Sequence, residues 1–185
     1  DHFTFQQMER SHILCYLIPG AEGEAQPGKR RINWVWYWNV PEAELRQLMT
    51  GVDGRERNFS VPPGQVREEW LRKQDAIAEN VFCPQSLELW RATETPFLQP
   101  ILDLAVHHMV QGRVVLLGDA AFIPRPHTAA STAKAAANAL ALGRALQEFP
   151  DDIDAALKGW EADQLALGRH LERSGRALGN RSQFP

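Results

Sequence analysis

Asp119 is the residue of this chain whose type and position point most directly to chemistry. It follows the apolar residues of GRVVLLGDA and precedes an alanine-rich run from about Ser131 to Phe149. The apolar residues predict a short, buried strand in the middle of a sheet, and the alanine-rich run predicts a helix. A carboxylate at the end of a strand can accept hydrogen bonds from sugar-like hydroxyls. The sequence therefore predicts a ligand site between this strand and this helix.

The start of the predicted helix supplies a second kind of ligand group. The first N–H groups of a helix have no partner inside it, so they attract carbonyl oxygens and anionic rings. The small side chains along Gly112–Leu146 would let a flat ligand approach the backbone closely. An ordinary strand end followed by a good helix former gives the same pattern without any ligand. The residues alone leave both interpretations open.

The order and spacing of three motifs carry a resemblance to a known family. GDAAF at 118–122, RPH at 125–127 and TAKAAANA at 132–139 resemble the GD motif of FAD-dependent aromatic-ring hydroxylases, the group A flavoprotein monooxygenases. They are most similar to the 2,6-dihydroxypyridine hydroxylase branch. The WVWYWNVP strand, the SVPPG loop and the closing helix also resemble that branch, so the resemblance covers most of the chain.

The resemblance implies a role for each matching residue. The GD aspartate of the family holds the ribityl chain of the flavin, the glycine before it permits close approach, and a loop proline borders the cavity. Amides at the start of the next helix bind the pyrimidine edge and stabilise negative charge there. The expected FAD-contacting residues are Gly118, Asp119, Pro126, Ser131, Thr132 and Ala133.

Three residues depart from the family pattern. Ser131 stands where the family commonly has glycine, and Asn138 stands where it has aspartate. Ser131 either crowds the isoalloxazine ring or adds a hydroxyl donor to it. Phe122 replaces a histidine of the hydroxybenzoate branch, which argues against hydroxybenzoate as substrate.

The strand RINWVWYWNV places two sets of side chains on opposite faces, because side chains alternate along a strand. Trp34, Trp36 and Trp38 form one set, which we expect to pack in the core or between two lobes of the chain. The other face is the candidate substrate pocket. The resemblance implies that Phe5, Tyr16 and Tyr37 face the substrate, although ordinary sheet packing explains these residues equally well.

Other reactive residue types form no recognisable site. Cys15 and Cys83 form no CxxC pair and are expected to be reduced, buried thiols. His107 and His108 are adjacent, so on a strand they would point to opposite faces and could not readily share a metal ion. We predict no metal site and no essential catalytic side chain. Arg125 and His127 are either polar contacts at the cavity mouth or residues that brace the loop.

The remaining pattern predicts the elements that position these residues. Strands at 2–8, 12–18 and 31–40 form an antiparallel meander with a long hairpin loop from Gly20 to Arg30. Helices are expected at 42–50, 65–81 and 86–92, and further strands at 96–108 and 112–120. The chain closes with the helix at 131–149 and one that runs from Asp151, as N-cap, toward Gly175.

These elements predict an α/β fold with α+β character. A substrate-binding sheet lobe with inserted helices is expected at 1–110, and the GD-motif strand, loop and C-terminal helices at 111–185. No GxGxxG motif occurs, so the Rossmann-type FAD-binding unit is expected to be absent from this chain. We interpret the sequence, which begins at Asp1 rather than Met, as a fragment whose N-terminal segment is missing.

Composition limits the classes of partner. The 20 Lys and Arg residues are outnumbered by 23 Asp and Glu residues, which argues against nucleic-acid binding. No apolar run reaches the roughly 20 residues that span a bilayer, and no signal peptide is recognisable. We expect a cytoplasmic protein that binds a small aromatic molecule. Its oligomeric state is open, with a homodimer among the expected assemblies.

The function implied by the resemblance is hydroxylation of an aromatic or heteroaromatic ring, such as a phenol or hydroxypyridine, with O2, FAD and NADH or NADPH. Two alternatives are open. The chain is a non-catalytic fragment or aromatic-ligand-binding domain that cannot hold FAD alone, or it belongs to a related flavin oxidoreductase that does not hydroxylate.

Overall fold

The computed structural model describes residues 2–183 and divides them into two compact units. The first unit runs up to Pro100 and the second begins at Ile101. Both units combine helices with small antiparallel sheets, in agreement with the predicted α+β character. Each unit is described separately below.

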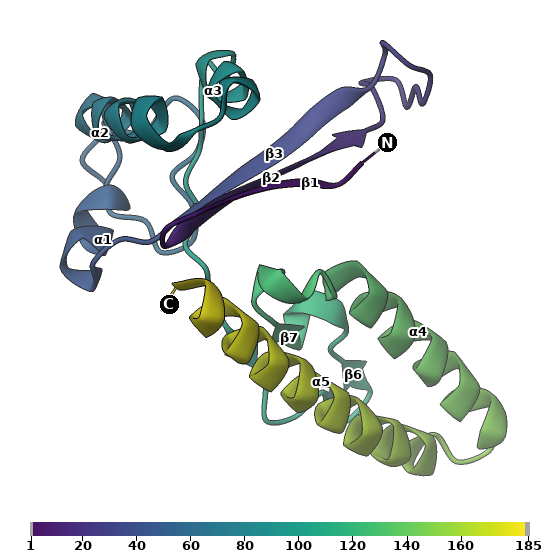
Figure 1. Ribbon diagram of the computed structural model, residues 1–185. Helices are drawn as coiled ribbons and strands as arrows, with labels where there is room; N and C mark the ends of the chain where they lie inside the picture. Colours follow the sequence, from purple (N-terminus) through teal and green to yellow (C-terminus); the bar gives the residue numbers. More distant parts are fainter. Residues whose placement is uncertain (1, 184–185) are drawn as a thin grey trace. The chain divides into compact units, whose positions relative to one another are not determined.

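A three-stranded antiparallel sheet dominates the first unit (Figure 1). Its strands are β1 (Thr4–Met8), β2 (Ser11–Ile18) and β3 (Arg31–Trp38), paired in that order. The long connection between β2 and β3 forms the predicted hairpin loop. The register pairs Tyr37 with His12 and Trp36 with Ile13. The meander predicted from aromatic and β-branched runs is therefore confirmed.

Three helices complete the first unit: α1 (Glu42–Leu48), α2 (Glu68–Val81) and α3 (Pro84–Arg91). The tryptophan face of the sheet packs against α3 and the end of α2. The Trp36 ring lies 4.6 Å from Phe82 and 5.9 Å from Trp90, and the Trp34 indole N–H donates to Thr93 Oγ1 at 3.1 Å. The tryptophan row therefore packs against these helices within the first unit, with all three indoles half-buried.

A second apolar cluster holds α1 and α2 together. Trp70 is buried there with residues of α1 and of the loop before α2, namely Leu48, Met49, Val61 and Val66. Backbone hydrogen bonds between Val61 and Leu98 tie the SVPPG loop to the end of the unit. These contacts fix the irregular chain that the sequence could not assign to a helix or strand.

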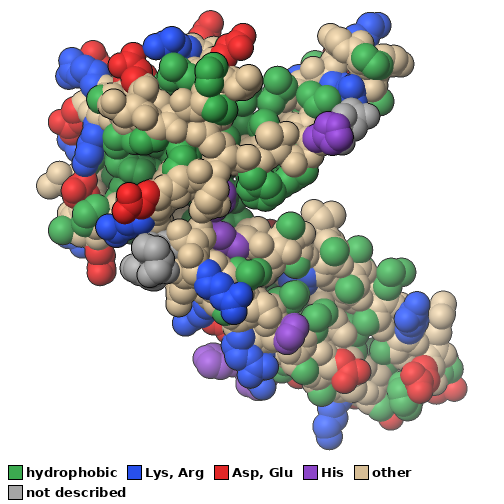
Figure 2. All heavy atoms as spheres, viewed as in Figure 1, with side chains coloured by type: hydrophobic (Ala, Val, Ile, Leu, Met, Phe, Trp, Pro, Cys, Tyr) green, Lys and Arg blue, Asp and Glu red, His purple; other side chains and the backbone are tan. Residues whose placement is uncertain are grey.

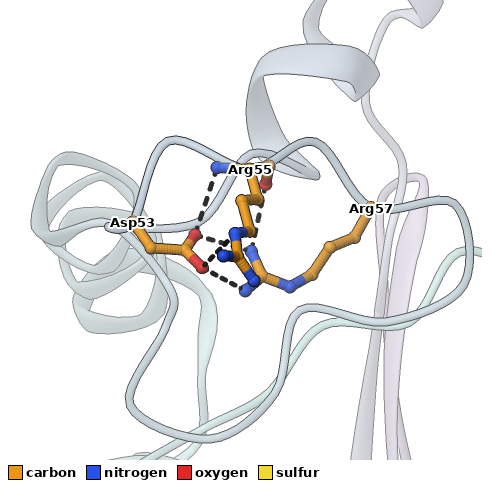
Figure 3. Close-up of polar contacts among 3 residues, drawn as sticks. All are labelled: Asp53, Arg55 and Arg57. Carbon is orange, nitrogen blue, oxygen red and sulfur yellow. Dashed lines mark hydrogen bonds and ion pairs between the residues drawn. The ribbon is translucent and has the colours of Figure 1, made fainter.

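The loop between α1 and α2 is closed by an ion pair (Figure 3). Asp53 accepts hydrogen bonds from two Arg57 nitrogens at 2.9 and 2.7 Å and from the Arg55 backbone N–H at 3.1 Å. The Arg57 hydrogen bond, and then the Arg55 N–H, lower the pKa of Asp53 from 3.8 to about 2. Asp53 is therefore ionised through the ordinary pH range.

The second unit has only two-residue strands. β4 (Leu104–Ala105) pairs with β7 (Phe122–Ile123), and β5 (Val110–Gln111) pairs with β6 (Val114–Val115). Short 3-10 helices η1 (Gly118–Ala120) and η2 (Pro126–Thr128) flank β7. Two long helices, α4 (Ser131–Glu148) and α5 (Ile153–Gln183), pack against these segments (Figure 1).

The two strands predicted at 96–108 and 112–120 are wrong. Gly112 and Gly118 have positive φ, so the chain turns near both ends of the second segment, and β6 pairs with β5 in a separate two-stranded sheet instead of lying within a larger one. Pro96 and Pro100 lack the N–H that a ladder needs, and only Leu104–Ala105 of the first segment is a strand. The predicted burial is also wrong, because Val114 is 66% exposed and Val115, Leu116 and Leu117 are only half-buried.

The last helix also differs from its prediction. The Ala155 N–H donates to Asp152 Oδ1 at 3.0 Å, so Asp152 rather than Asp151 caps α5. The helix continues to Gln183, beyond the predicted end near Gly175. Gly175 faces Arg125 and Thr128 from within the helix, where a glycine makes room for a neighbouring segment and does not end the helix.

The surface carries charges of both signs. On the face shown in Figure 2, acidic and basic side chains are interspersed over the region of α1 and α2. Over residues 2–183, none of the helices combines the length and the apolar composition needed to span a bilayer.

Candidate functional site

The GD turn is built around a glycine that no other residue can replace without strain. Gly118 is buried with φ of 59°, and a Cβ added there would lie 3.1 Å from the Ala135 Cβ. Its N–H donates to Asn138 Oδ1 at 3.1 Å. The turn is thus pressed against α4 with almost no space between the two backbones.

Asn138 is the centre of a buried polar network. Its side chain is fully buried, and its Nδ2 donates to Gln164 Oε1 at 2.8 Å. The Trp160 indole N–H donates to the Asn138 carbonyl at 3.0 Å. Because these residues come from η1, α4 and α5, the network fixes the GD turn to both long helices. The sequence marked Asn138 only as a departure from the family pattern.

The Asp119 carboxylate reaches the surface from this fixed turn. Its side chain is 62% exposed, and one oxygen, Oδ1, accepts a hydrogen bond from Lys134 Nζ at 2.8 Å. The Lys134 side chain is completely buried and also donates to the Phe122 carbonyl. Sequence analysis assigned Lys134 no role. The signal was its spacing, because Lys134 and Asn138 lie four residues apart on one face of an alanine-rich helix.

The N-terminus of α4 is open. No side chain among residues 2–183 caps this helix, and its first backbone hydrogen bond runs from the Lys134 N–H to the Ala130 carbonyl at 2.8 Å. The amides of Ser131, Thr132 and Ala133 come before that bond. Thr132 and Ala133 are exposed and Ser131 is half-buried. Unpartnered amides at this position suit an electron-rich ligand edge.

The loop that carries Pro126 is held by α5. Arg125 donates from Nε to Asp103 at 3.2 Å and from Nη1 to Asn180 at 3.1 Å. Space for this loop comes from Gly175 and Gly179, where an added Cβ would lie 3.0 Å or less from Arg125 atoms. These contacts support the loop-bracing interpretation of Arg125, while Pro126 itself is exposed.

His127 lies in the same loop and is half-buried. Burial, and then the Arg125 charge, lower the pKa of His127, and Asp103 opposes that shift. Its imidazole is therefore neutral at neutral pH.

In the first unit, the strand register places Phe5, Tyr16 and Tyr37 on one face of the sheet. Tyr37 stacks on His12 with ring centroids 4.5 Å apart, and Phe5 lies 6.3 Å from His12. Burial, and then the Tyr16 phenol, raise the pKa of Tyr37. His12 is the member of this aromatic face that sequence reasoning missed, although its position opposite Tyr37 follows from the register.

This face is only partly covered in the first unit. Phe5 is 59% exposed, whereas His12 is buried. A small hollow of about 210 Å³ lies at the far end of the sheet, lined by His2, Phe3, Tyr16, Leu17 and Arg30. Phe3 stacks on Tyr16 there, at 5.1 Å. Exposed aromatic rings beside buried ones are suited to contact with a flat, partly polar molecule.

Within residues 2–183, no three His, Cys, Asp or Glu side chains come close enough together to hold a metal ion. The adjacent His107 and His108 are both exposed, and the His108 imidazole lies 3.8 Å from Glu161.

Comparison with known proteins identifies the family. Residues 1–103 match the FAD binding domain-like family. The 2,6-dihydroxypyridine 3-monooxygenase of Paenarthrobacter nicotinovorans is 36% identical over 184 residues, which cover 99% of this chain and 45% of that enzyme. The chain therefore spans less than half the length of this curated relative.

Solved structures agree with the sequence match. The 2,6-dihydroxypyridine-3-hydroxylase from Arthrobacter nicotinovorans has a TM-score of 0.87 at 35% identity, and the alignment covers 98% of this chain and 45% of that one. Klebsiella pneumoniae HpxO, solved with FAD and uric acid, has a TM-score of 0.66 at 21% identity, with 100% and 40% covered, and shows the same fold. The chain belongs to the FAD binding domain-like family, in agreement with the resemblance seen in its GD motif.

Proposed function

We propose that this chain is part of an FAD-dependent monooxygenase that hydroxylates an aromatic or heteroaromatic ring of the phenol or hydroxypyridine class. FAD, reduced by NADH or NADPH, supplies the activation of O2 when it is bound. The residues of this chain hold the flavin, orient the ring and exclude water. The family match and the 36% identity to a dihydroxypyridine monooxygenase support this assignment.

The second unit is assigned to the flavin. Asp119 accepts hydrogen bonds from ribityl hydroxyls, and Gly118 keeps the backbone close to the ligand. The amides of Ser131, Thr132 and Ala133 donate to the pyrimidine edge and stabilise negative charge there. Pro126 borders the ring. An exposed carboxylate and an uncapped helix start fit these roles, because both groups are available to a ligand.

The first unit is assigned to the ring to be hydroxylated. Phe5, Tyr16 and Tyr37 supply aromatic contact area, and the two phenols supply hydrogen bonds to ring hydroxyls or nitrogens. Because the pKa of Tyr37 is raised, its phenol stays protonated and remains a donor at neutral pH. Pairing donors with substrate hydroxyls gives selectivity that apolar contact alone does not give.

One observation carries the proposal: the GD turn presents the Asp119 carboxylate to solvent, and Lys134 in the first turn of α4, a helix with an open N-terminus, contacts that carboxylate. The rest of the flavin cradle, a strand–helix–strand unit with a glycine-rich turn, is proposed to come from polypeptide outside these 185 residues. The 45% coverage of the dihydroxypyridine monooxygenase supports this division.

FAD titration tests the assignment of the second unit. Flavin fluorescence and visible absorbance are measured with the chain, with Asp119→Ala and with the control Asp163→Ala, which removes an exposed carboxylate of α5. We expect Asp119→Ala to weaken FAD binding roughly tenfold or more, since a charge-assisted hydrogen bond contributes about 1.5–3 kcal/mol. Equal affinities for the two variants would contradict the role of Asp119. A chain that binds no FAD would support the alternative of a fragment unable to hold the cofactor alone.

Substrate turnover tests the reaction in the full-length protein. Consumption of NADH and of NADPH is followed with phenols and hydroxypyridines, and the product mass is measured. A gain of one oxygen atom supports hydroxylation. Nucleotide oxidation with an unchanged ring, or with another product mass, would assign the protein to a flavin oxidoreductase that does not hydroxylate.

A further inference from the structure

The buried lysine of the second unit has no role in the assignments above. The Lys134 side chain has no exposed surface, although a lysine ammonium is among the groups least often buried. Burying a charge is costly unless it is paired and hydrogen-bonded. Lys134 has two partners, the Asp119 carboxylate at 2.8 Å and the Phe122 carbonyl.

The two partners of Lys134 lie on either side of the GD turn. Asp119 is in η1 and Phe122 begins β7, so the ammonium joins the start and the end of the segment that follows Gly118. Lys134 itself is held in α4, whose next turn carries Asn138. A buried ammonium on a rigid helix is thus a fixed point from which the exposed carboxylate is oriented.

The two oxygens of the Asp119 carboxylate are therefore in different environments. Oδ1 is bound to the buried ammonium, while the side chain as a whole is 62% exposed and no hydrogen bond is found for Oδ2 within residues 2–183. An exposed aspartate without a partner samples several rotamers. Holding one oxygen inward selects the rotamer in which the other oxygen faces outward.

We propose that Lys134 is a positioning residue: it fixes the rotamer of Asp119 so that one carboxylate oxygen is presented to the hydroxyls of a bound polyol chain. This inference rests on the proposed function for the identity of the ligand, but the fixed rotamer is a property of the chain alone. Lys134 acts through Asp119 and need not touch the flavin.

The rotamer is measured directly, without any flavin. Three-bond NMR couplings between the Asp119 Hα and its two Hβ atoms are compared in the wild-type chain, in Lys134→Met and in the control Lys158→Met, which removes an exposed lysine of α5. We expect one dominant rotamer in the wild type and in the control, and averaged couplings in Lys134→Met. Unchanged couplings in Lys134→Met would overturn the inference.

A thermal melt separates positioning from a purely structural role. Methionine fills nearly the same volume as lysine, and the Asp119 carboxylate left behind is exposed and can be hydrated. The buried Phe122 carbonyl loses its lysine donor, at about 1–3 kcal/mol, so we expect Lys134→Met to fold and to melt no more than about ten degrees below the wild type. If Lys134→Met does not fold, Lys134→Gln serves instead, because its amide can still donate to the Phe122 carbonyl without carrying a charge.

A double-mutant cycle links the rotamer to ligand binding. FAD affinity is measured for the wild type, Lys134→Met, Asp119→Asn and the double variant. We expect each single variant to bind roughly tenfold more weakly, and the double variant to bind no more weakly than Asp119→Asn. Additive losses would overturn the inference, because Lys134 would then act independently of Asp119. If the wild type binds no FAD, the assignment of this unit to the flavin fails, while the NMR couplings still decide the role of Lys134.

Discussion

The two units hold their candidate residues by different means. In the first unit, Phe5, Tyr16 and Tyr37 are placed by strand register and ring contacts, and the opposite face of the sheet is anchored by indoles in edge-to-face contact. In the second unit, Asp119 is placed by buried polar groups, chiefly Lys134 and Asn138. Apolar packing tolerates adjustment, whereas a buried polar network requires each of its partners. We therefore expect the second unit to be the more sensitive to single substitutions.

The largest expected effect is that of Asn138→Ala. Removing this side chain leaves the buried Gly118 N–H and Gln164 Oε1 without partners, at about 1–3 kcal/mol each, so we expect a loss of about 3 kcal/mol in unfolding free energy. Urea denaturation measures the loss. Gln147→Ala, an exposed amide on the same helix, is the control and should change stability by less than about 0.5 kcal/mol. A similar, small effect for both variants would contradict the expectation that the second unit depends on its buried polar network.

A smaller loss is expected for Gly168→Ala. The new Cβ would lie 2.3 Å from the buried Phe122 ring, so the ring or the helix must shift, at a cost of about 1–3 kcal/mol. Gly159→Ala is the matched control, because it lies in the same helix and, apart from its own stretch of helix, no atom of residues 2–183 lies within 4 Å of the added Cβ. We expect it to stabilise the chain by about 0.5–1 kcal/mol. Equal melting temperatures for the two variants would show that α5 and β7 are not in close contact.

Two tryptophans, one in each unit, allow the comparison of the units to be tested with the same residue type. Trp160 donates its indole N–H to the Asn138 carbonyl, while the buried Trp70 N–H has no hydrogen-bond partner within residues 2–183. Replacement by phenylalanine removes a satisfied donor in one case and an unsatisfied one in the other. We expect Trp160→Phe to cost about 1–2 kcal/mol more than Trp70→Phe in chemical denaturation. The reverse order would mean that volume, not polar pairing, dominates both sites.

The smallest expected effect concerns the Asp53 loop of the first unit. The pKa of the Asp53 carboxyl is lowered in the folded chain, so the ionised carboxylate stabilises the fold above pH 3.8. This contribution disappears as the pH falls toward 2. Melting temperatures between pH 5 and pH 2 should therefore fall less for Asp53→Asn than for the wild type. Parallel curves would show that the Arg57 ion pair contributes nothing measurable.

Sequence analysis predicted the first unit well because its signals are local. Alternation of side chains fixed the faces of the strand at 31–38, and the turn residues fixed the boundaries of the meander. The second unit was predicted less well. Its strands depend on which segments pair, and positive φ at Gly112 and Gly118 turned the chain where an apolar run suggested extension.

The candidate site was predicted as a motif but not as a network. The positions of Asp119 and of the open helix start followed from GDAA and the alanine-rich run, and the FAD contacts assigned to them remain predictions. The spacing of Lys134 and Asn138 was a signal that both share a helix face, but the burial of Lys134 and Gln164 could not be predicted, because a polar residue in a helix is normally solvated and its burial depends on packing between distant segments. His12 was missed for a related reason, since its stacking on Tyr37 requires the exact register.

The alternation along β3 has a practical consequence for engineering. Side chains at 34, 36 and 38 pack against the helices of the first unit, and those at 35 and 37 lie on the opposite face of the sheet. The two sets can therefore be varied separately. A library restricted to 35 and 37, with their cross-strand neighbours Leu14 and His12, would explore new ring preferences on an unchanged scaffold. Insertion of one residue into the strand would instead exchange both surfaces at once.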